Sequence, residues 1–179
     1  CNPNLPCSAY HDLYASDICS GVTLYPGGIY SSNAIASGFP IFSLTFFGSD
    51  NGLLHAITVD GNYIPGWPVQ FQEETGTVSF ADLNGDGVSE IVATSVNKIF
   101  ALNLDGTSYN SNHFPVITEF SISSTPIISD FDGDNDLEII VGTLADIVSI
   151  DIMEQGGVSA GYWSMAKSNN HRNSYFSAS

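Results

Sequence analysis

The chain has 179 residues and a formal net charge of −16, from 19 acidic side chains and only 3 basic ones. Nucleic-acid binding through phosphate contacts needs several Lys and Arg side chains on one face, so this balance excludes it. The shortage of cations also excludes attraction to an anionic membrane surface. No apolar run approaches the ~18 residues that a membrane span requires. The acidity instead indicates metal cations as partners.

Residues 1–32 are predicted to form an N-terminal leader rich in Cys, Pro and Gly. All three cysteines, Cys1, Cys7 and Cys19, lie in it, and their spacing with His11 matches no common zinc site. We expect a Cys7–Cys19 disulfide, which indicates an oxidising, extracellular compartment. Cys1 is then left for an intermolecular disulfide or for a lipid anchor, and the sequence leaves both open.

The first of three predicted repeats covers about residues 33–77. Its segments Phe46–Gly48 and Leu53–Gly61 line up with a later part of the chain at a constant shift of 45. A constant shift over a whole segment is hard to obtain by chance, so it indicates an internal repeat. Ser37 stands where the second repeat has Asp82, and the first repeat therefore lacks acidic residues at that loop.

The second and third repeats each contain an acidic loop followed by two apolar segments. The loops begin at Asp82 and Asp130, which are 48 residues apart. The apolar segments are Ile91–Thr94, Ile99–Leu104, Ile139–Gly142 and Ile147–Ile152. We place the second and third repeats at about 78–122 and 123–170, within one repeat domain that covers residues 33–179.

Every repeat has the composition of β structure. Short segments rich in Ile, Val, Phe and Thr alternate with Asp-Gly and Asn-Gly pairs, which are typical of hairpin turns, and no segment has a helical period. A period of 45–48 residues holds four strands and their turns, the size of a propeller blade. The predicted fold is therefore all-β, with about three four-stranded blades. A β-sandwich whose two similar loops arose by chance is the alternative.

The two acidic loops place oxygen atoms at alternate positions. The side chains at loop positions 1, 3, 5 and 9 are Asp82, Asn84, Asp86 and Glu90 in one loop and Asp130, Asp132, Asp134 and Glu138 in the other. Val88 and Asp136, at position 7, would each offer a main-chain carbonyl. Hard oxygen ligands in a flexible loop suit Ca²⁺, so we predict two calcium sites. The simpler alternative is a pair of acidic turns held by Asx-type hydrogen bonds.

These loops, each followed by an Ile-rich strand and a Gly/Thr-containing turn, resemble the FG-GAP/VCBS repeats of integrin-α-type β-propellers. The resemblance covers roughly residues 33–170. It implies a Ca²⁺ ion in the hairpin loop of a blade, an extracellular location, and a role in adhesion, carbohydrate contact or structural display. The first repeat departs from the family pattern because it has no ligands, and three repeats are fewer than a family ring usually has.

Two further motifs carry the same resemblance. Gly66-Trp67-Pro68 resembles the GWP sequence that often closes such repeats. Trp163-Ser164-Met165, followed by Asn169, Asn170 and Arg172, resembles the end of the last blade in bacterial members. Since each blade buries its face only against a neighbour, three blades need additional blades from the same or another chain, or a homo-oligomer, or a filament.

No nucleophile elbow, phosphate-binding loop or HExxH motif occurs, so we expect no enzymatic activity. His55 lies within an apolar strand pattern and is interpreted as a packing residue. We expect a secreted or surface-anchored, calcium-stabilised structural or adhesive module. The alternatives are a carbohydrate-binding, lectin-like module that uses Trp67, Tyr162 and Trp163, or the non-catalytic part of a polysaccharide-active enzyme.

Overall fold

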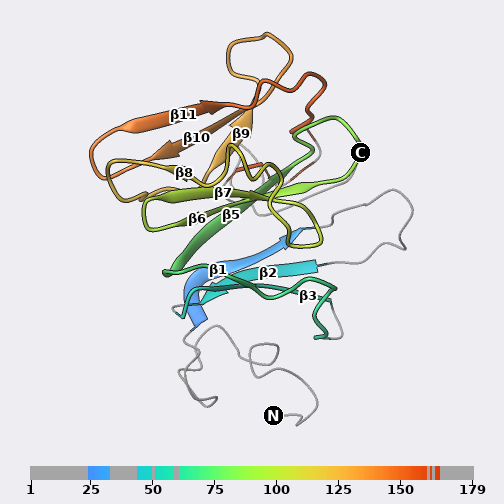
Figure 1. Cartoon of the computed structure of the whole chain (residues 1–179), viewed down its shortest axis with the longest axis vertical. Helices are drawn as coiled ribbons and strands as arrows, with labels where there is room; N and C mark the ends of the chain where they lie inside the picture. The colour runs from blue at the N-terminus through green and yellow to red at the C-terminus, as the bar shows by residue number, and fades with distance from the viewer. Residues whose placement is uncertain are drawn as a thin grey trace.

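The computed structural model describes residues 24–32, 44–49, 51–58, 61–160, 162, 164 and 165. In this part of the chain every regular element is a strand, which confirms the all-β prediction. No described helix is long and apolar enough to cross a membrane. The strands form three antiparallel sheets that lie one above another as layers (Figure 1).

Each sheet is an antiparallel meander of consecutive strands. The first sheet consists of β1 (Leu24–Ser32), β2 (Leu44–Ser49), β3 (Leu53–Thr58) and β4 (Val69–Gln70). The second consists of β5 (Thr75–Ala81), β6 (Glu90–Ser95), β7 (Lys98–Leu102) and β8 (Val116–Ile117). The third consists of β9 (Ile127–Ser129), β10 (Glu138–Gly142) and β11 (Ile147–Asp151). The predicted apolar segments of the second and third repeats thus coincide with β6, β7, β10 and β11.

The third sheet has three described strands where the sequence predicts four. The chain that follows β11 leaves this sheet and pairs instead with the end of the second one, through a β-bridge between Val158 and Asp82. At the other end of the molecule, β1 falls within residues 1–32 and pairs with β2. The three cysteines, the expected Cys7–Cys19 disulfide and Ser37 lie outside the described residues.

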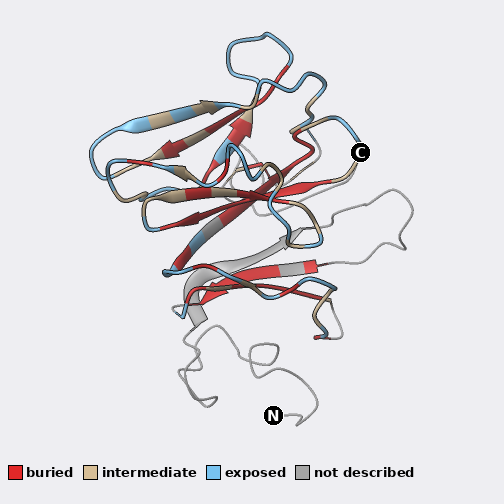
Figure 2. Ribbon diagram, in the orientation of Figure 1, coloured by how far each residue is buried: buried red, intermediate tan, exposed pale blue. Residues whose placement is uncertain are grey.

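Two hydrophobic cores hold the layers together. The first lies between the first and second sheets, and the second lies between the second and third sheets. β6 serves both cores, because Ile91 and Ala93 face the first and Val92 faces the second. All six residues of β6 are buried, which makes the second sheet the most enclosed layer (Figure 2).

The Gly66-Trp67-Pro68 motif joins the first two layers. Trp67 is 7% exposed within the first core, and its indole Nε1 donates a hydrogen bond of 2.8 Å to the carbonyl oxygen of Leu104. Gly66 has φ +89°, and a Cβ there would collide with the carbonyl oxygen of Asp105. A side chain at position 66 would therefore push the two layers apart.

The second repeat has a counterpart to this motif that the sequence analysis did not identify. Phe114 and Pro115 precede β8 just as Trp67 and Pro68 precede β4, and both X-Pro bonds are cis. Phe114 is buried in the second core, as Trp67 is in the first. An aromatic residue before proline is the shared signal, and the change from Trp to Phe obscured it.

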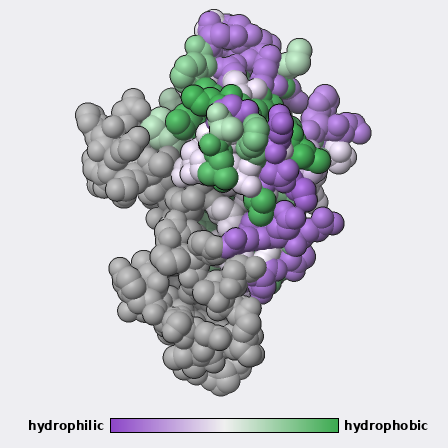
Figure 3. Space-filling model, turned by 90° about the vertical axis from the view of Figure 1, so that its left-hand side faces the viewer, coloured by the Kyte–Doolittle hydropathy of each residue, from purple (hydrophilic) through white to green (hydrophobic). Residues whose placement is uncertain are grey.

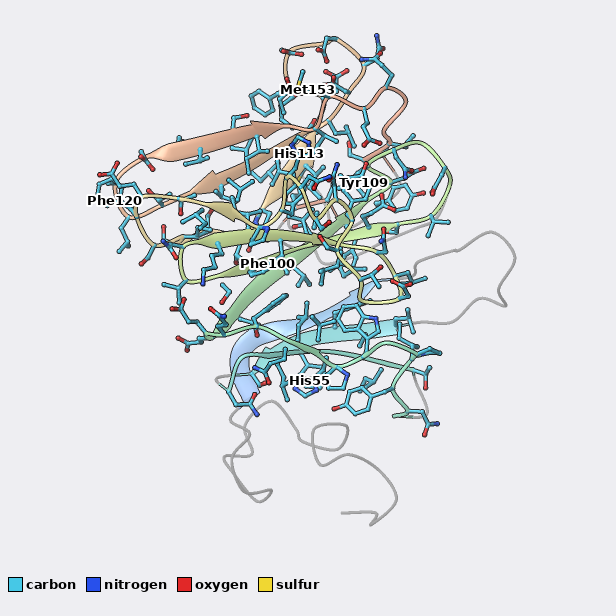
Figure 4. The ribbon with its side chains drawn as sticks, in the orientation of Figure 1. His55, Phe100, Tyr109, His113, Phe120 and Met153 are labelled. Carbon is cyan, nitrogen blue, oxygen red and sulfur yellow. The ribbon has the colours of Figure 1, made fainter. Side chains whose placement is uncertain are left out.

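The outer face of the third sheet is exposed. Alternation along β9 and β10 turns Ile128 and Ile139 into the second core and their neighbours outward. Large hydrophobic side chains remain exposed on this sheet and its loops: Ile127, Phe131, Leu144, Ile147 and Met153. Leu144 and Ile147 are 76% and 78% exposed. Hydrophobic and hydrophilic surface alternate on the face shown in Figure 3, which is the side of Phe120 in Figure 4.

Candidate metal centre

The two acidic loops occupy equivalent places in neighbouring sheets. Loop A, residues 82–90, joins β5 to β6, and loop B, residues 130–138, joins β9 to β10. Each loop therefore connects the first two strands of its meander. Repetition of the meander places the loops at the same end of adjacent layers, as Figure 1 shows.

The carboxylate of Asp82 organises loop A. Its Oδ1 accepts hydrogen bonds from the main-chain N–H groups of Gly85 and Asp86, at 2.7 and 3.1 Å, and its Oδ2 accepts one from Gly87 at 2.8 Å. Glu90 closes the loop because its Oε2 accepts the N–H of Leu83 at 2.7 Å. The first and last acidic residues thus fix the turn from inside.

Loop B repeats this arrangement. Oδ1 of Asp130 accepts the N–H of Gly133 at 2.7 Å, and its Oδ2 accepts that of Asn135 at 3.3 Å. Oε2 of Glu138 accepts the N–H of Phe131 at 2.5 Å. Gly133 and Asn135 have φ +86° and +74°, matching +75° and +84° at the same positions of loop A. Asn135 thus adopts the left-handed conformation that Gly87 has at this position of loop A.

Loop B brings its carboxylates into two groups that could hold a metal ion. Ligand atoms of Asp130, Asp132 and Glu138 lie within 4.8 Å of one another, and so do those of Asp134, Asp136 and Glu138. Carboxylate oxygens of this kind are the ligands that hard cations such as Ca²⁺ prefer. The side chain of Asp136 belongs to a group, whereas the sequence analysis assigned this residue only a main-chain carbonyl.

Two oxygens in these groups have no hydrogen-bond partner. Asp136 and Glu138 are 5% and 6% exposed, and Oδ1 of Asp136 and Oε1 of Glu138 are buried without a donor. A buried carboxylate oxygen that has lost water and gained no donor is costly. Asx-type hydrogen bonds therefore account for Asp130 but not for these two oxygens.

Loop A is less acidic and its geometry differs. It has Asn84 where loop B has Asp132, and Asn84 Nδ2 lies 3.4 Å from Oδ2 of Asp86. Among the described residues, the carboxylates of Asp82, Asp86 and Glu90 do not form a close group of three. Because Asn84 and Val88 stand where loop B has Asp132 and Asp136, loop A has three carboxylates and loop B has five.

Two of the loop carboxylates, Glu90 and Asp136, have raised pKa values. Burial, together with the charges of Asp86, Asp82 and Glu154, raises the pKa of Glu90 to about 7, although the hydrogen bond from the N–H of Leu83 opposes the shift. Burial likewise raises the pKa of Asp136 to about 6, with Asp134 adding to the effect. These shifts mean that Glu90 and Asp136 resist ionisation when no cation is nearby.

No basic side chain of the described residues neutralises the loops. Lys98 is the only Lys or Arg in this part of the chain, and it pairs with Ser95. Ser95 and Glu90 are the two ends of β6, which separates them by about 17 Å at ~3.3 Å per residue. Neutralisation of loop A by Lys98 is therefore weak at physiological salt.

A segment after β11, residues 154–158, connects the two loops. The main chains of Val158 and Asp82 exchange hydrogen bonds of 2.7 and 3.0 Å, and the N–H of Gly156 donates to the carbonyl oxygen of Asn135 at 3.1 Å. Gln155 Nε2 lies 3.5 Å from Oδ2 of Asp136. No local sequence pattern predicts this connection, and the Gly156-Gly157 pair is the one signal available for it.

Tyr109 also lies near loop A (Figure 4). Burial raises the pKa of its hydroxyl, and the charges of Glu154, Glu90 and Asp86 contribute. The phenol therefore stays neutral beside the carboxylates at physiological pH. Tyr109 is 19 residues from Glu90 along the chain, so no local sequence pattern connects it with loop A.

His55 has the packing role that the sequence predicts. It is 2% exposed, its ring stacks on Phe47, and its nitrogens lie 3.2 Å from Ser49 Oγ and 2.7 Å from Tyr63 Oη. Burial lowers its pKa to about 4. Trp163, Asn169, Asn170 and Arg172 lie outside the described residues, so the closing motif stays a prediction.

Comparison of the sequence with protein-family models and with curated proteins finds no match. The resemblance to FG-GAP/VCBS repeats therefore rests on the residues of loops A and B and on the Gly66-Trp67-Pro68 motif. The structure itself shows an all-β fold and, in loop B, acidic groups that could hold a metal ion.

Proposed function

We propose that the chain is a calcium-stabilised, non-enzymatic structural module of the β-propeller type that works outside the cell. The observation that carries the proposal is the pair of buried, unpartnered carboxylate oxygens on Asp136 and Glu138, next to three more carboxylates of loop B. A divalent cation would satisfy these oxygens and offset the mutual repulsion of the loop.

Calcium fits the loops better than the other common divalent ions. Ca²⁺ accepts six to eight oxygen ligands in irregular geometry, whereas Mg²⁺ needs a near-ideal octahedron and gives up water reluctantly. Zn²⁺ favours Cys and His ligands, and loops A and B contain neither. Loops A and B, with ligands from Asp82 to Glu90 and from Asp130 to Glu138, are the two proposed sites.

The stacked meanders support the propeller part of the proposal. The second sheet is covered on both faces by its neighbours, as an internal blade is. The third sheet leaves Ile127, Leu144 and Ile147 exposed on its outer side. We propose that a further sheet covers this side, supplied by another copy of the chain or by additional blades, in a surface assembly or filament.

The extracellular location follows from the same chemistry. Calcium is abundant outside cells, where even sites of modest affinity are filled. The cysteines near the N-terminus also suit an oxidising compartment.

Burial of Trp67 favours a structural role over carbohydrate binding. A sugar-stacking platform needs an exposed aromatic face, but the Trp67 ring packs edge-on against Phe46 within the first core. Its N–H is used by Leu104. Of the three aromatic residues considered for sugar binding, Trp67 is thereby assigned to packing.

Thermal unfolding with and without calcium tests the metal part of the proposal. One filled site at a calcium concentration about 100 times its Kd adds about 2.7 kcal/mol to the free energy of unfolding. We expect excess chelator to lower the Tm, and Asp82→Asn and Asp130→Asn each to weaken the response to calcium. Glu119→Gln removes an exposed carboxylate outside the loops and serves as the matched control. A Tm that is the same in chelator and in calcium would refute the proposal.

Light scattering of the calcium-loaded chain tests the assembly. We expect a mass above 19.1 kDa at micromolar concentration. Ile147→Lys, which places a charge on the outer face of the third sheet, should shift the mass towards that of the monomer, whereas Ser111→Lys at an exposed turn of the second repeat should not. A compact monomer in the unmodified chain would count against covering of this face by another copy.

A further inference from the structure

Asp136 is the position at which loops A and B differ most. Loop A has Val88 there, whose side chain cannot ligate a cation. The carboxylate of Asp136 is 5% exposed, and only its Oδ2 has a partner, the amide of Gln155 at 3.5 Å. Its Oδ1 is buried with no donor. A main-chain ligand at this position would not need the side chain, so the buried carboxylate requires a separate explanation.

The geometry of loop B provides two places for a cation rather than one. The group formed by Asp130, Asp132 and Glu138 follows the spacing of the predicted calcium loop. The second group consists of Asp134, Asp136 and Glu138, again with ligand atoms within 4.8 Å of one another. Glu138 belongs to both groups. Its Oε2 accepts the N–H of Phe131, which leaves the buried Oε1 free to face cations.

Charge also distinguishes the two loops. Loop A has three carboxylates, so one divalent ion leaves it with a single negative charge. Loop B has five carboxylates, and one divalent ion would leave three negative charges in a partly buried turn. A second divalent ion would bring loop B to the same residual charge as loop A. Carboxylates commonly bridge two divalent ions that lie about 3.5–4 Å apart.

We infer that loop B holds two divalent cations that share Glu138, and that the side chains of Asp134 and Asp136 bind the second of them. The inference rests on the proposed function, because the first ion is the one proposed there. The inference adds a second cation to loop B, with the carboxylate of Asp136 as one of its ligands. Loop A cannot hold such an ion, because Val88 stands at this position. Loops A and B together then bind three divalent ions.

Calcium titration of the chelator-stripped full chain by isothermal calorimetry measures the number directly. We expect three Ca²⁺ per chain, and two in both Asp136→Asn and Asp136→Val. The second variant copies the residue of loop A, which forms the same turn with valine at this position. Glu119→Gln should retain three, and Asp82→Asn should lose the ion of loop A.

The outcomes separate this inference from the proposed function. If the chain binds two Ca²⁺ and both Asp136 variants retain two while Asp82→Asn loses one, the shared-Glu138 pair is refuted and the proposed calcium sites stand. If the chain binds no Ca²⁺ at all, both fail.

Manganese provides a measurement that does not depend on a variant folding. Mn²⁺ prefers the same oxygen ligands, and two Mn²⁺ ions that share a carboxylate are magnetically coupled. We expect the electron paramagnetic resonance spectrum of the chain loaded with three Mn²⁺ to contain a coupled pair besides an isolated ion. A spectrum of isolated ions alone would refute the inference.

Discussion

Gly85 and Gly133 offer a matched pair of substitutions that tests how loop A meets the rest of the molecule. Both occupy position 4 of their loops, with φ +75° and +86°. A Cβ at Gly85 would lie 2.5 Å from the carbonyl oxygen of Gly156, whereas a Cβ at Gly133 would meet no atom within 4 Å. The two alanine variants therefore share the backbone strain and differ in one contact.

The magnitudes follow from these distances. Alanine at a left-handed φ costs about 1–2 kcal/mol, and both variants should lose this much stability. At position 85 the 2.5 Å approach is well inside the ~3.3 Å at which carbon and carbonyl oxygen meet. The segment 154–158 must then retreat, and the two hydrogen bonds between Val158 and Asp82 weaken. Losing both costs about 2 kcal/mol more.

Urea unfolding in excess chelator isolates this difference, because no bound metal contributes under those conditions. We expect Gly85→Ala to be less stable than Gly133→Ala by about 2 kcal/mol, or roughly 4–8 °C in Tm for a chain of this size. Equal losses in the two variants would refute the packing of residues 154–158 on loop A.

Three other substitutions test the layers. Burial lowers the pKa of His55 from its usual 6.5 to about 4, so on acidification the ring is protonated in the unfolded chain before it is protonated in the folded one. The stability that the neutral, buried ring contributes is complete above pH 6.5 and is lost as the pH falls towards 4. Between pH 6.5 and 4 we expect the free energy of unfolding of the unmodified chain to fall by about 1.4 kcal/mol per pH unit more than that of His55→Gln. If the free energies of the two proteins changed in parallel with pH, the burial of the neutral ring would be contradicted. Trp67→Phe should cost about 1–3 kcal/mol in chemical denaturation, because it removes packing and leaves the carbonyl of Leu104 without its 2.8 Å donor; an unchanged midpoint would contradict the contact. Ser79→Ala should cost about 1–2 kcal/mol in the same assay, since the buried Ser79 Oγ donates a 2.6 Å hydrogen bond to the carbonyl of Pro126 and joins the second and third sheets.

The strands and the two loops were open to prediction because their signals are local. The continuous apolar runs of β6 and β10, and glycine or asparagine at the turn positions of the loops, act over a few residues. The burial of His55 followed from the strand pattern around it. In each case, neighbours in the sequence determine the environment of the residue.

The features that the sequence did not reveal depend on contacts between distant residues. Val158 pairs with Asp82 across 76 positions, and nothing in either local pattern indicates the partner. The same crossing carries the chain after β11 to loop A, and the third sheet has three described strands. The carboxylate of Asp136 was not predicted as a ligand for a different reason, because position 7 was expected to offer a main-chain carbonyl in both loops.

The segment 154–158 makes the two loops depend on each other. Gly156 is hydrogen-bonded to Asn135 of loop B, while Val158, two residues later, is paired with Asp82 of loop A. A cation that holds loop B in place would therefore also hold Val158, the residue that pairs with Asp82, in position. Loop A leads into the buried β6 of the second sheet, and loop B leads into β10 of the third sheet. A cation that orders these loops would therefore help to position both sheets. Cations bound in the two loops would in this way stabilise the stacking of the sheets, as the proposed structural module requires.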